Sequence, residues 1–319
     1  MEDSMASDTL IFYHRLVFSP SRHKTHSLDT EFWQKSKKKM CPLQITPRQS
    51  IENAAYHHDS QIEGEKNGIQ VIFGNKRVGG GVLGEGGFQE ELYFCRYPEL
   101  LPAILLFEQL EDLEAAFYAG AQRYVDSEGY GSEFKFIKGY KEESIKKDIF
   151  ERKDVAMVAI DAFNFKAGDG ILEKLVENER QKESSSPKEV LLSSSTLQFS
   201  TNLLLRELNK AFVGFSASDA LEEEESAPRR VVSGKWGCGD FEGDFQLKII
   251  IQWLAASQAG RKIQICIPEG GLEGWEEVER GGSKMNVGEM FKVLEEFGKV
   301  KEGGVDVGMF EFFRDFVDL

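Results

Sequence analysis

Hydrophobic residues recur along this chain in two patterns, one in which alternate residues are apolar and one in which apolar residues are spaced by three and four. The first pattern is typical of strands and the second of packed helices. Strands are predicted at Ile69 to Phe73, Ala115 to Ala119, Glu133 to Gly139, Val155 to Ile160 and Lys262 to Pro268. Helices are predicted at Ala103 to Leu113, Thr201 to Val213, Phe245 to Ala256, Val287 to Phe297 and Met309 to Phe316. Together they predict an α/β fold.

The segment from Val155 to Ile160 is nearly all apolar, as expected of a central strand that is covered on both faces. A layered fold, with a sheet between helices, is therefore expected. Residues 1–60 are polar, rich in His and Lys and interrupted by prolines, which predicts a thin, partly ordered extension before a compact unit at residues 61–319. The charged segments 177–186 and 221–228 are predicted to be surface loops.

A glycine-rich stretch follows the strand predicted to end at Phe73. Glycines at positions 79–81 leave room for backbone N–H groups to approach a bulky ligand, and they permit φ values that other residues avoid. Further glycines at positions 84, 86 and 87 extend this loop. Amide groups turned inward there would form a nest able to hold a diphosphate.

Two adjacent carboxylates come directly after the glycine loop. Gln89-Glu90-Glu91 begins a helix predicted from Phe88 to Tyr97, which ends there because the residue before Pro98 is disfavoured in the α region. Partial burial raises the pKa of a carboxyl group toward the working pH, where it can act as a general acid. The sequence therefore predicts a site that cleaves glycosidic bonds.

Composition narrows the classes of ligand. The 319 residues include 39 basic and 54 acidic side chains, a net charge of −15, which repels polyanions at long range. Direct nucleic-acid binding is not expected, and local amides would have to bind any phosphate. The four cysteines have no metal-ligand spacing, and the five histidines all precede the glycine loop. Neither a metal centre nor a His relay is therefore expected, and no export signal or membrane span is expected.

The three glycines, a spacer from Val82 to Phe88, and Gln89-Glu90-Glu91 resemble the signature of the poly(ADP-ribose) glycohydrolase family. Other segments fall in the family's order: Phe73-Gly74-Asn75-Lys76, Tyr97-Pro98-Glu99-Leu100, Ala159-Ile160-Asp161-Ala162, Arg206-Glu207-Leu208-Asn209-Lys210-Ala211-Phe212 and Trp236-Gly237-Cys238-Gly239. The resemblance covers roughly Ile62 to Gly298. It implies a macrodomain-like mixed sheet between helical layers, with ADP-ribose lying across the crest of the sheet.

The same resemblance implies an activity and residue roles. The activity is hydrolysis of ribose–ribose O-glycosidic bonds in poly(ADP-ribose), releasing ADP-ribose. Glu91 would be the single general acid and base, and Glu90 would position the ribose hydroxyls. Asn75 and Gln89 have side chains able to hydrogen-bond the ribose. The other expected substrate-binding residues are Gly79, Gly80, Gly81 and Val82 in the first loop, Gly239, Asp240 and Phe241 in a second loop, Ile62 and Glu63 at the adenine, and Tyr130 over the diphosphate.

Four places depart from the family's pattern. Ile72 replaces an Asp, Ser127 a Tyr and Lys235 an Asn, and Gln264 to Pro268 lacks an aromatic that commonly stacks on adenine. The carboxylates and the three glycines are unaffected, so we expect retained chemistry with altered affinity.

Two other functions fit parts of the pattern. A non-catalytic macrodomain that only binds ADP-ribose needs no acid, which the tandem glutamates disfavour. A nucleotide-metabolising or phosphatase-like enzyme would carry Lys-Ser/Thr after the glycines or clustered carboxylates for a metal, and neither occurs in the loop. The resemblance implies a monomer that needs no cofactor and acts on poly(ADP-ribose) and ADP-ribosylated proteins. It also implies a role in the DNA damage response, in the nucleus and/or the cytoplasm.

Overall fold

A mixed β-sheet forms the centre of the protein. The computed structural model describes residues 11–17, 28–47, 59–65, 68–141, 147, 152–166, 197–216, 229–267 and 272–317. Within these residues seven strands pair in the order β1-β4-β7-β3-β8-β9-β2. They are β1 (Phe12–Val17), β2 (Leu43–Pro47), β3 (Gly68–Gly74), β4 (Glu114–Gly120), β7 (Lys153–Asp161), β8 (Arg230–Ser233) and β9 (Ile263–Ile267). β4 is antiparallel to β1 and β7, whereas the strands from β7 through to β2 are parallel.

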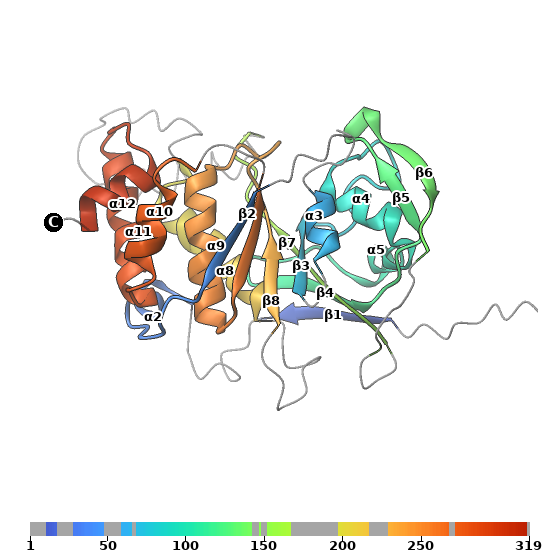
Figure 1. Ribbon diagram of the computed structural model, residues 1–319, viewed down its shortest axis with the longest axis horizontal. Coiled ribbons are helices and arrows are strands. Elements are labelled where there is room, and N and C mark those ends of the chain that lie inside the picture. Colours follow the sequence, from blue (N-terminus) through green and yellow to red (C-terminus); the bar gives the residue numbers. More distant parts are fainter. Residues whose placement is uncertain are drawn as a thin grey trace, which may run out of the picture.

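Helices cover both faces of this sheet (Figure 1). The larger layer consists of α2 (Thr30–Gln34), α8 (Thr201–Phe215), α9 (Phe245–Ala259), α10 (Trp275–Gly282), α11 (Val287–Glu302) and α12 (Met309–Val317). The smaller layer consists of α3 (Asp59–Gly64), α4 (Gln89–Arg96), α5 (Ala103–Leu106) and a separate hairpin of β5 (Val125–Glu128) and β6 (Lys135–Gly139). The predicted α/β class, with a mixed sheet between helical layers, is confirmed.

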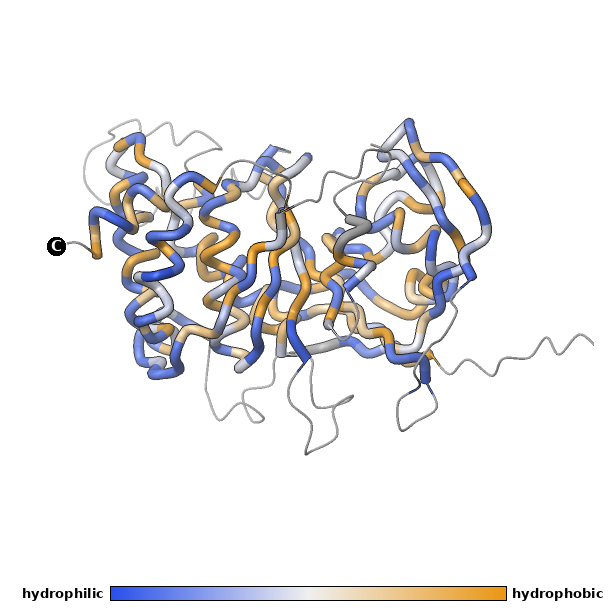
Figure 2. The backbone as a smooth tube through the Cα atoms, in the orientation of Figure 1, coloured by the Kyte–Doolittle hydropathy of each residue, from blue (hydrophilic) through white to orange (hydrophobic). Residues whose placement is uncertain are grey.

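The central strand β7 is buried on both faces of the sheet. In β7, Val158 and Ile160 pack toward the larger helical layer, while Met157 and Ala159 pack toward the smaller one. Figure 2 shows hydrophobic residues along these strands and along α9, which lies between the sheet and the outer helices. The prediction of a central strand covered on both faces is confirmed, because β7 lies between β4 and β3.

One helix was predicted too long. The pattern predicts a helix from Ala103 to Leu113, whereas α5 ends at Leu106 and Phe107 is already extended. The backbone N–H of Leu110 donates to the carbonyl of Lys76 at 2.8 Å, and this bond to the glycine loop replaces an intrahelical one. Leu105, within the predicted apolar face, is 90% exposed. Tertiary hydrogen bonding thus outweighs local helix spacing here.

The first sixty residues contribute more than the predicted extension. β1 pairs with β4 at one edge of the sheet and β2 pairs with β9 at the other. Trp33 on α2 is fully buried, and its indole N–H donates to Asn209 on α8 at 2.9 Å. The domain boundary at residue 61 stays a prediction. The segments 177–186 and 221–228 lie outside the described residues.

We expect Asn286→Ala to lower the free energy of unfolding by about 1 kcal/mol, the usual value of an N-cap. Asn286 precedes α11, and its side chain accepts from the backbone N–H of Glu289 at 3.0 Å, while the Glu289 side chain accepts from the N–H of Asn286 at 2.9 Å. Urea denaturation measures the change. Lys292→Ala, at an exposed position on the same helix, is the matched control and should change stability much less. Equal stability of the two variants would contradict the prediction.

Candidate active site

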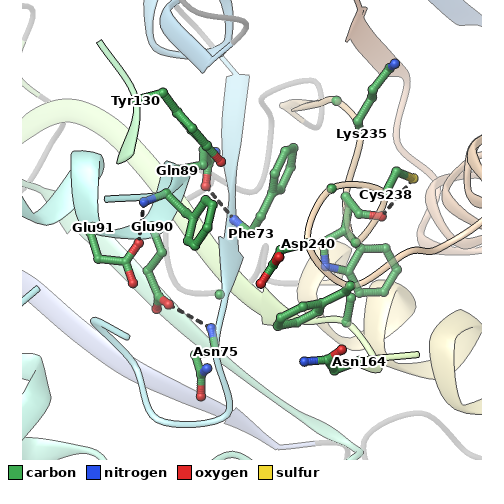
Figure 3. Close-up of a pocket in the computed structure, with 18 of the residues that line it drawn as sticks. Phe73, Asn75, Gln89, Glu90, Glu91, Tyr130, Asn164, Lys235, Cys238 and Asp240 are labelled. Atoms are coloured by element: carbon green, nitrogen blue, oxygen red, sulfur yellow. Dashed lines mark hydrogen bonds between the residues drawn. The ribbon is translucent and has the colours of Figure 1, made fainter. Parts of the chain in front are cut away.

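A pocket of about 710 Å³ opens where the carboxyl ends of the parallel strands meet. This is the edge at which ligands bind in open α/β sheets. Its walls come from the end of β3, the start of α4, and the loops after β7 and β8, together with Ile62 on α3, Tyr130 and Cys266. Figure 3 shows Glu90 and Glu91 on one wall and Asp240 and Asn164 on the opposite one.

Glu90 and Glu91 both line the pocket and are both largely buried. The carboxylate of Glu90 accepts from the backbone N–H groups of Asn75 and Gly79, each at 2.8 Å. The carboxylate of Glu91 accepts from the N–H groups of Gly81 and Phe88, also at 2.8 Å. Four main-chain donors therefore fix the two carboxylates side by side.

The glycine loop differs from its predicted role. We expected Gly79, Gly80, Gly81 and Val82 to present amides to a diphosphate, but none of them lines the pocket. The N–H groups of Gly79 and Gly81 hold the protein's own carboxylates, and those of Gly80 and Val82 donate to backbone carbonyls. The loop amides thus bind anions, as the glycines suggested, but these anions are the protein's own carboxylates.

Burial raises the pKa of the Glu90 carboxyl well above its usual value. The N–H donors of Gly79 and Asn75 act in the opposite direction, and the negative charges of Glu91 and Asp161 raise it further. Glu90 therefore holds a proton at a higher pH than an exposed glutamate does.

Asn75 and Gln89 were both predicted to meet a ribose. Asn75 lines the pocket from the end of β3, and its side-chain oxygen also accepts from the N–H of Arg77 at 3.2 Å. Gln89 reaches the pocket wall, but its side-chain amide bonds the backbone of β3, donating to Val71 at 2.9 Å and accepting from Phe73 at 2.7 Å. Gln89 therefore fixes α4 to the sheet.

The second glycine loop forms the opposite wall, where Gly239, Asp240 and Phe241 all line the pocket. Gly237 has a φ of +74°, and a Cβ there would lie 2.6 Å from Cβ of Ala162. Only glycine therefore lets this loop approach the loop after β7. Asp240 forms an ion pair with Lys166 at 2.9 Å across the two loops.

Buried ion pairs lie beneath these two loops. Glu207 on α8 pairs with Lys248 on α9, and it also accepts from the N–H of Phe163 at 3.0 Å. The Lys248 ammonium lies 3.9 Å from the ring centroid of Trp236, whose N–H donates to the carbonyl of Ile160 at 3.0 Å. One buried charge pair therefore fixes both loops of the wall to the helices behind them.

A second group of charges explains two motifs that lie far apart in the sequence. Asp161, at the end of β7, pairs with Arg206 and with Lys210, the latter at 2.7 Å. Both cations belong to the Arg206 to Phe212 segment of α8. The two motifs therefore meet in a packed contact inside the protein.

Of the two residues predicted to contact adenine, one lines the pocket and the other does not. Ile62 lines the pocket beside Phe73 and Cys266. Glu63 does not line it, because its carboxylate is buried in ion pairs with Arg96 and, at 3.3 Å, with Arg123. Glu63 thus fixes α3 against α4 in this structure.

The aromatic and thiol groups complete the lining. Tyr130 lines the pocket, and its ring contacts Phe88 edge to face, with centroids 5.4 Å apart. Burial raises the pKa of the Cys238 thiol and that of the Cys266 thiol to about 12, so both stay protonated near neutral pH.

Within the described residues no three His, Cys, Asp or Glu side chains are grouped as metal ligands. No described helix has the length and apolar character needed to span a membrane.

Two of the sequence departures do not reach the pocket. Ile72 is fully buried in the core beneath α4, and Ser127 is buried where it accepts from Nε of Arg96 at 2.8 Å. Lys235 does line the pocket, and its ammonium lies 4.7 Å from the ring centroid of Phe245. Gln264 is buried and donates to Thr46 at 3.0 Å. Cys266, within the segment that lacks the aromatic residue, lines the pocket as well, so altered affinity is expected to come from Lys235 and from this segment.

Phe73, Phe88 and Asn164 are among the lining residues that the sequence analysis did not predict as site residues. Asn164 follows the covered strand β7. Because side chains just after the ends of neighbouring parallel strands converge, this position could have predicted a place in the site. Phe88 gave no signal, because an aromatic residue at a helix start has no capping function.

The chain is similar to known proteins over most of its length. The family model described as "Poly (ADP-ribose) glycohydrolase (PARG), Macro domain fold" matches residues 30–185 and 188–269. Poly(ADP-ribose) glycohydrolase 2 of Caenorhabditis elegans is 34% identical over 249 residues, which cover 76% of this chain and 44% of the relative. Poly(ADP-ribose) glycohydrolase 1 of Arabidopsis thaliana is 30% identical over 287 residues, covering 77% of this chain and 49% of the relative.

Among solved structures, poly(ADP-ribose) glycohydrolase from Deinococcus radiodurans in complex with ADP-ribose is 15% identical, with a TM-score of 0.39. The match covers 79% of this chain and 87% of that one. The chain spans less than half the length of the two curated relatives described above.

Proposed function

Because the chain belongs to the poly(ADP-ribose) glycohydrolase family, we propose that it hydrolyses the ribose–ribose O-glycosidic bonds of poly(ADP-ribose) and releases ADP-ribose. One observation carries the proposal beyond family membership. Two adjacent carboxylates, each held by two backbone N–H donors, face a pocket whose volume of about 710 Å³ suits a small-molecule ligand.

In this proposal Glu91 is the general acid. It gives its proton to the oxygen that joins the two riboses, the bond from that oxygen to the anomeric carbon breaks, and an oxocarbenium-like sugar forms. The Glu91 carboxylate then takes a proton from a water molecule whose oxygen bonds to the anomeric carbon. This returns Glu91 to its acid form and leaves one free ADP-ribose.

Adjacent residues in one helical turn cannot flank a sugar ring on opposite faces, as the two carboxylates of most glycosidases do. One carboxylate must therefore serve as both acid and base. In this proposal Glu90, held beside Glu91 by the N–H groups of Asn75 and Gly79, accepts from ribose hydroxyls. Its charge, when ionised, also stabilises the cationic sugar.

The remaining lining suits the rest of ADP-ribose. The loop from Gly237 to Phe241 offers backbone amides and space for the diphosphate, and the Phe241 ring offers an apolar face for a ribose. Ile62 offers an apolar contact for adenine. The substrates in this proposal are poly(ADP-ribose) chains and the proteins that carry them.

The proposal is tested by incubating the chain with poly(ADP-ribose) and identifying the products by liquid chromatography and mass spectrometry. Free ADP-ribose that accumulates as the polymer shortens is the expected result. Isothermal titration with ADP-ribose is the companion measurement. Binding of ADP-ribose without any loss of polymer length would replace this proposal with a non-catalytic reader.

A further inference from the structure

Strand β6, outside the pocket, is exposed along its whole length. All five of its residues, Lys135 to Gly139, are exposed, and two of them are large apolar side chains, Phe136 at 62% and Ile137 at 47%. Successive side chains of a strand point to opposite faces, so both faces of β6 are open to a ligand. Within the described residues β6 pairs only with β5. Packing among these residues therefore does not account for the exposed apolar side chains.

The charge of this segment is opposite to that of the whole chain. Residues 135–141, here named the β6 strip, include Lys135, Lys138 and Lys141 and no acidic residue, whereas the net charge of the chain is −15. All three lysines are exposed. Lys138 lies 3.9 Å from Asp126 and keeps 71% of its side chain exposed. An aromatic ring between cations is how proteins bind polymers of nucleotides, since the ring stacks on a base while the cations pair with phosphates.

The β6 strip begins near the pocket and leads away from it. Tyr130, which lines the pocket, lies in the turn between β5 and β6, and Lys135 at the start of β6 is the strand partner of Glu128. At the far end of the hairpin, the N–H of Tyr124 donates to the carbonyl of Arg96, the last residue of α4, at 2.9 Å. The hairpin thus lies beside α4, which begins at the pocket (Figure 1). The five residues of β6 span about 16 Å, so the strip extends beyond the pocket.

We propose that the β6 strip is an exosite for poly(ADP-ribose), where units of the polymer outside the pocket bind. The inference rests on the proposed glycohydrolase activity and adds a second contact with the same substrate. Each unit of the polymer carries an adenine and two phosphates, so it offers a base to Phe136 and negative charge to the lysines. An acidic protein segment would offer the charge without the base.

The exosite gives long polymers an advantage over short substrates. A substrate that ends at the pocket cannot reach the strip, whereas a long polymer contacts both. The positive charge of the strip also offsets locally the repulsion between a polyanion and the rest of this acidic protein.

The test compares a sized long polymer with ADP-ribose joined to a single ribose, which has neither a base nor a phosphate outside the pocket. We expect Phe136→Ala to lower kcat/KM about tenfold on the long polymer, a loss within the range of one base–aromatic stack. On the short substrate kcat/KM should not change, and the Kd of ADP-ribose should stay the same. Phe136→Tyr, which keeps a ring, should behave as wild type.

The lysines are tested by salt dependence. Each phosphate contact on a single strand contributes about 0.7 to the slope of log affinity against log salt, so the double variant Lys135→Gln, Lys138→Gln should reduce that slope by about 1.4 on the long polymer. Phe316→Ala and Lys292→Gln remove an exposed ring on α12 and an exposed lysine on α11, and as matched controls they should change neither measurement.

Equal losses of kcat/KM on both substrates would mean that Phe136 acts through the fold, and they would overturn the exosite. Unchanged kinetics on the long polymer would overturn it as well. If Phe136→Ala instead weakens binding of single-stranded DNA or polyglutamate and leaves polymer cleavage intact, the strip belongs to a nucleic acid or an acidic protein. Wild type that cleaves neither substrate would refute the glycohydrolase proposal, whereas wild type that cleaves both and is unaffected by the strip variants would refute the exosite alone.

Discussion

Glu91→Gln is expected to lower kcat for polymer shortening by about 10³-fold, within the range that one general acid–base group contributes. Glutamine has nearly the same shape but cannot release a proton. Its oxygen can still accept from the N–H of Gly81 or Phe88, so the start of α4 should remain in place. Polymer shortening is followed on sized chains, and the Kd of ADP-ribose is measured by titration.

The Glu91→Gln variant is interpreted by comparing its change in kcat with its change in the Kd of ADP-ribose. A lost proton donor lowers kcat while the Kd of ADP-ribose stays close to that of wild type. Glu85→Gln is the matched control, because Glu85 is an exposed glutamate in the same loop and does not line the pocket. Retention of wild-type kcat in Glu91→Gln would rule out Glu91 as the acid. A loss of binding equal to the loss of rate would assign Glu91 to substrate binding.

Gly80→Ala is expected to lower kcat about 100-fold, which is the cost of displacing catalytic groups by about 1 Å. Gly80 has a φ of +50°, in the left-handed region that glycine tolerates best. A Cβ there would overlap Oε1 of Glu91 and lie 2.9 Å from Oε2 of Glu90. The added methyl group must therefore displace one or both carboxylates.

Gly84→Ala is the matched control for this loop. A Cβ on Gly84 would lie 3.5 Å from the carbonyl oxygen of Gly81, an ordinary contact, so kcat should stay near wild type. Steady-state kinetics on sized polymer and thermal unfolding of both variants separate a local effect from unfolding. A Gly80→Ala protein that folds and keeps full kcat would show that this glycine does not set the position of the carboxylates.

Much of the fold could be predicted because its central strands carry their own signal. β3, β4 and β7 alternate side chains between two covered faces, so their apolar runs are visible without any partner. α4 ends before Pro98 as predicted, since proline restricts the residue that precedes it. β1 and β2 were missed, because both form by backbone pairing with strands far along the chain.

The candidate site was predictable in part for a similar reason. Glu90, Glu91 and Asn75 lie close together in sequence on two sides of one glycine loop, so their spacing alone places them together. Glu63 could not be assigned this way. Its partners Arg96 and Arg123 come from other elements, and only their approach turns a possible ligand contact into a buried ion pair.

The order of residues specifies a glycine loop and paired glutamates after a buried strand, and the motif order of one family. What the loop binds depends on how the folded elements pack. Backbone N–H groups are alike at every residue, so no sequence pattern states whether they point to a ligand or to a carboxylate of the protein. Packing of α4 against β3 settled that choice, because it brought Glu90 and Glu91 within 2.8 Å of the loop amides.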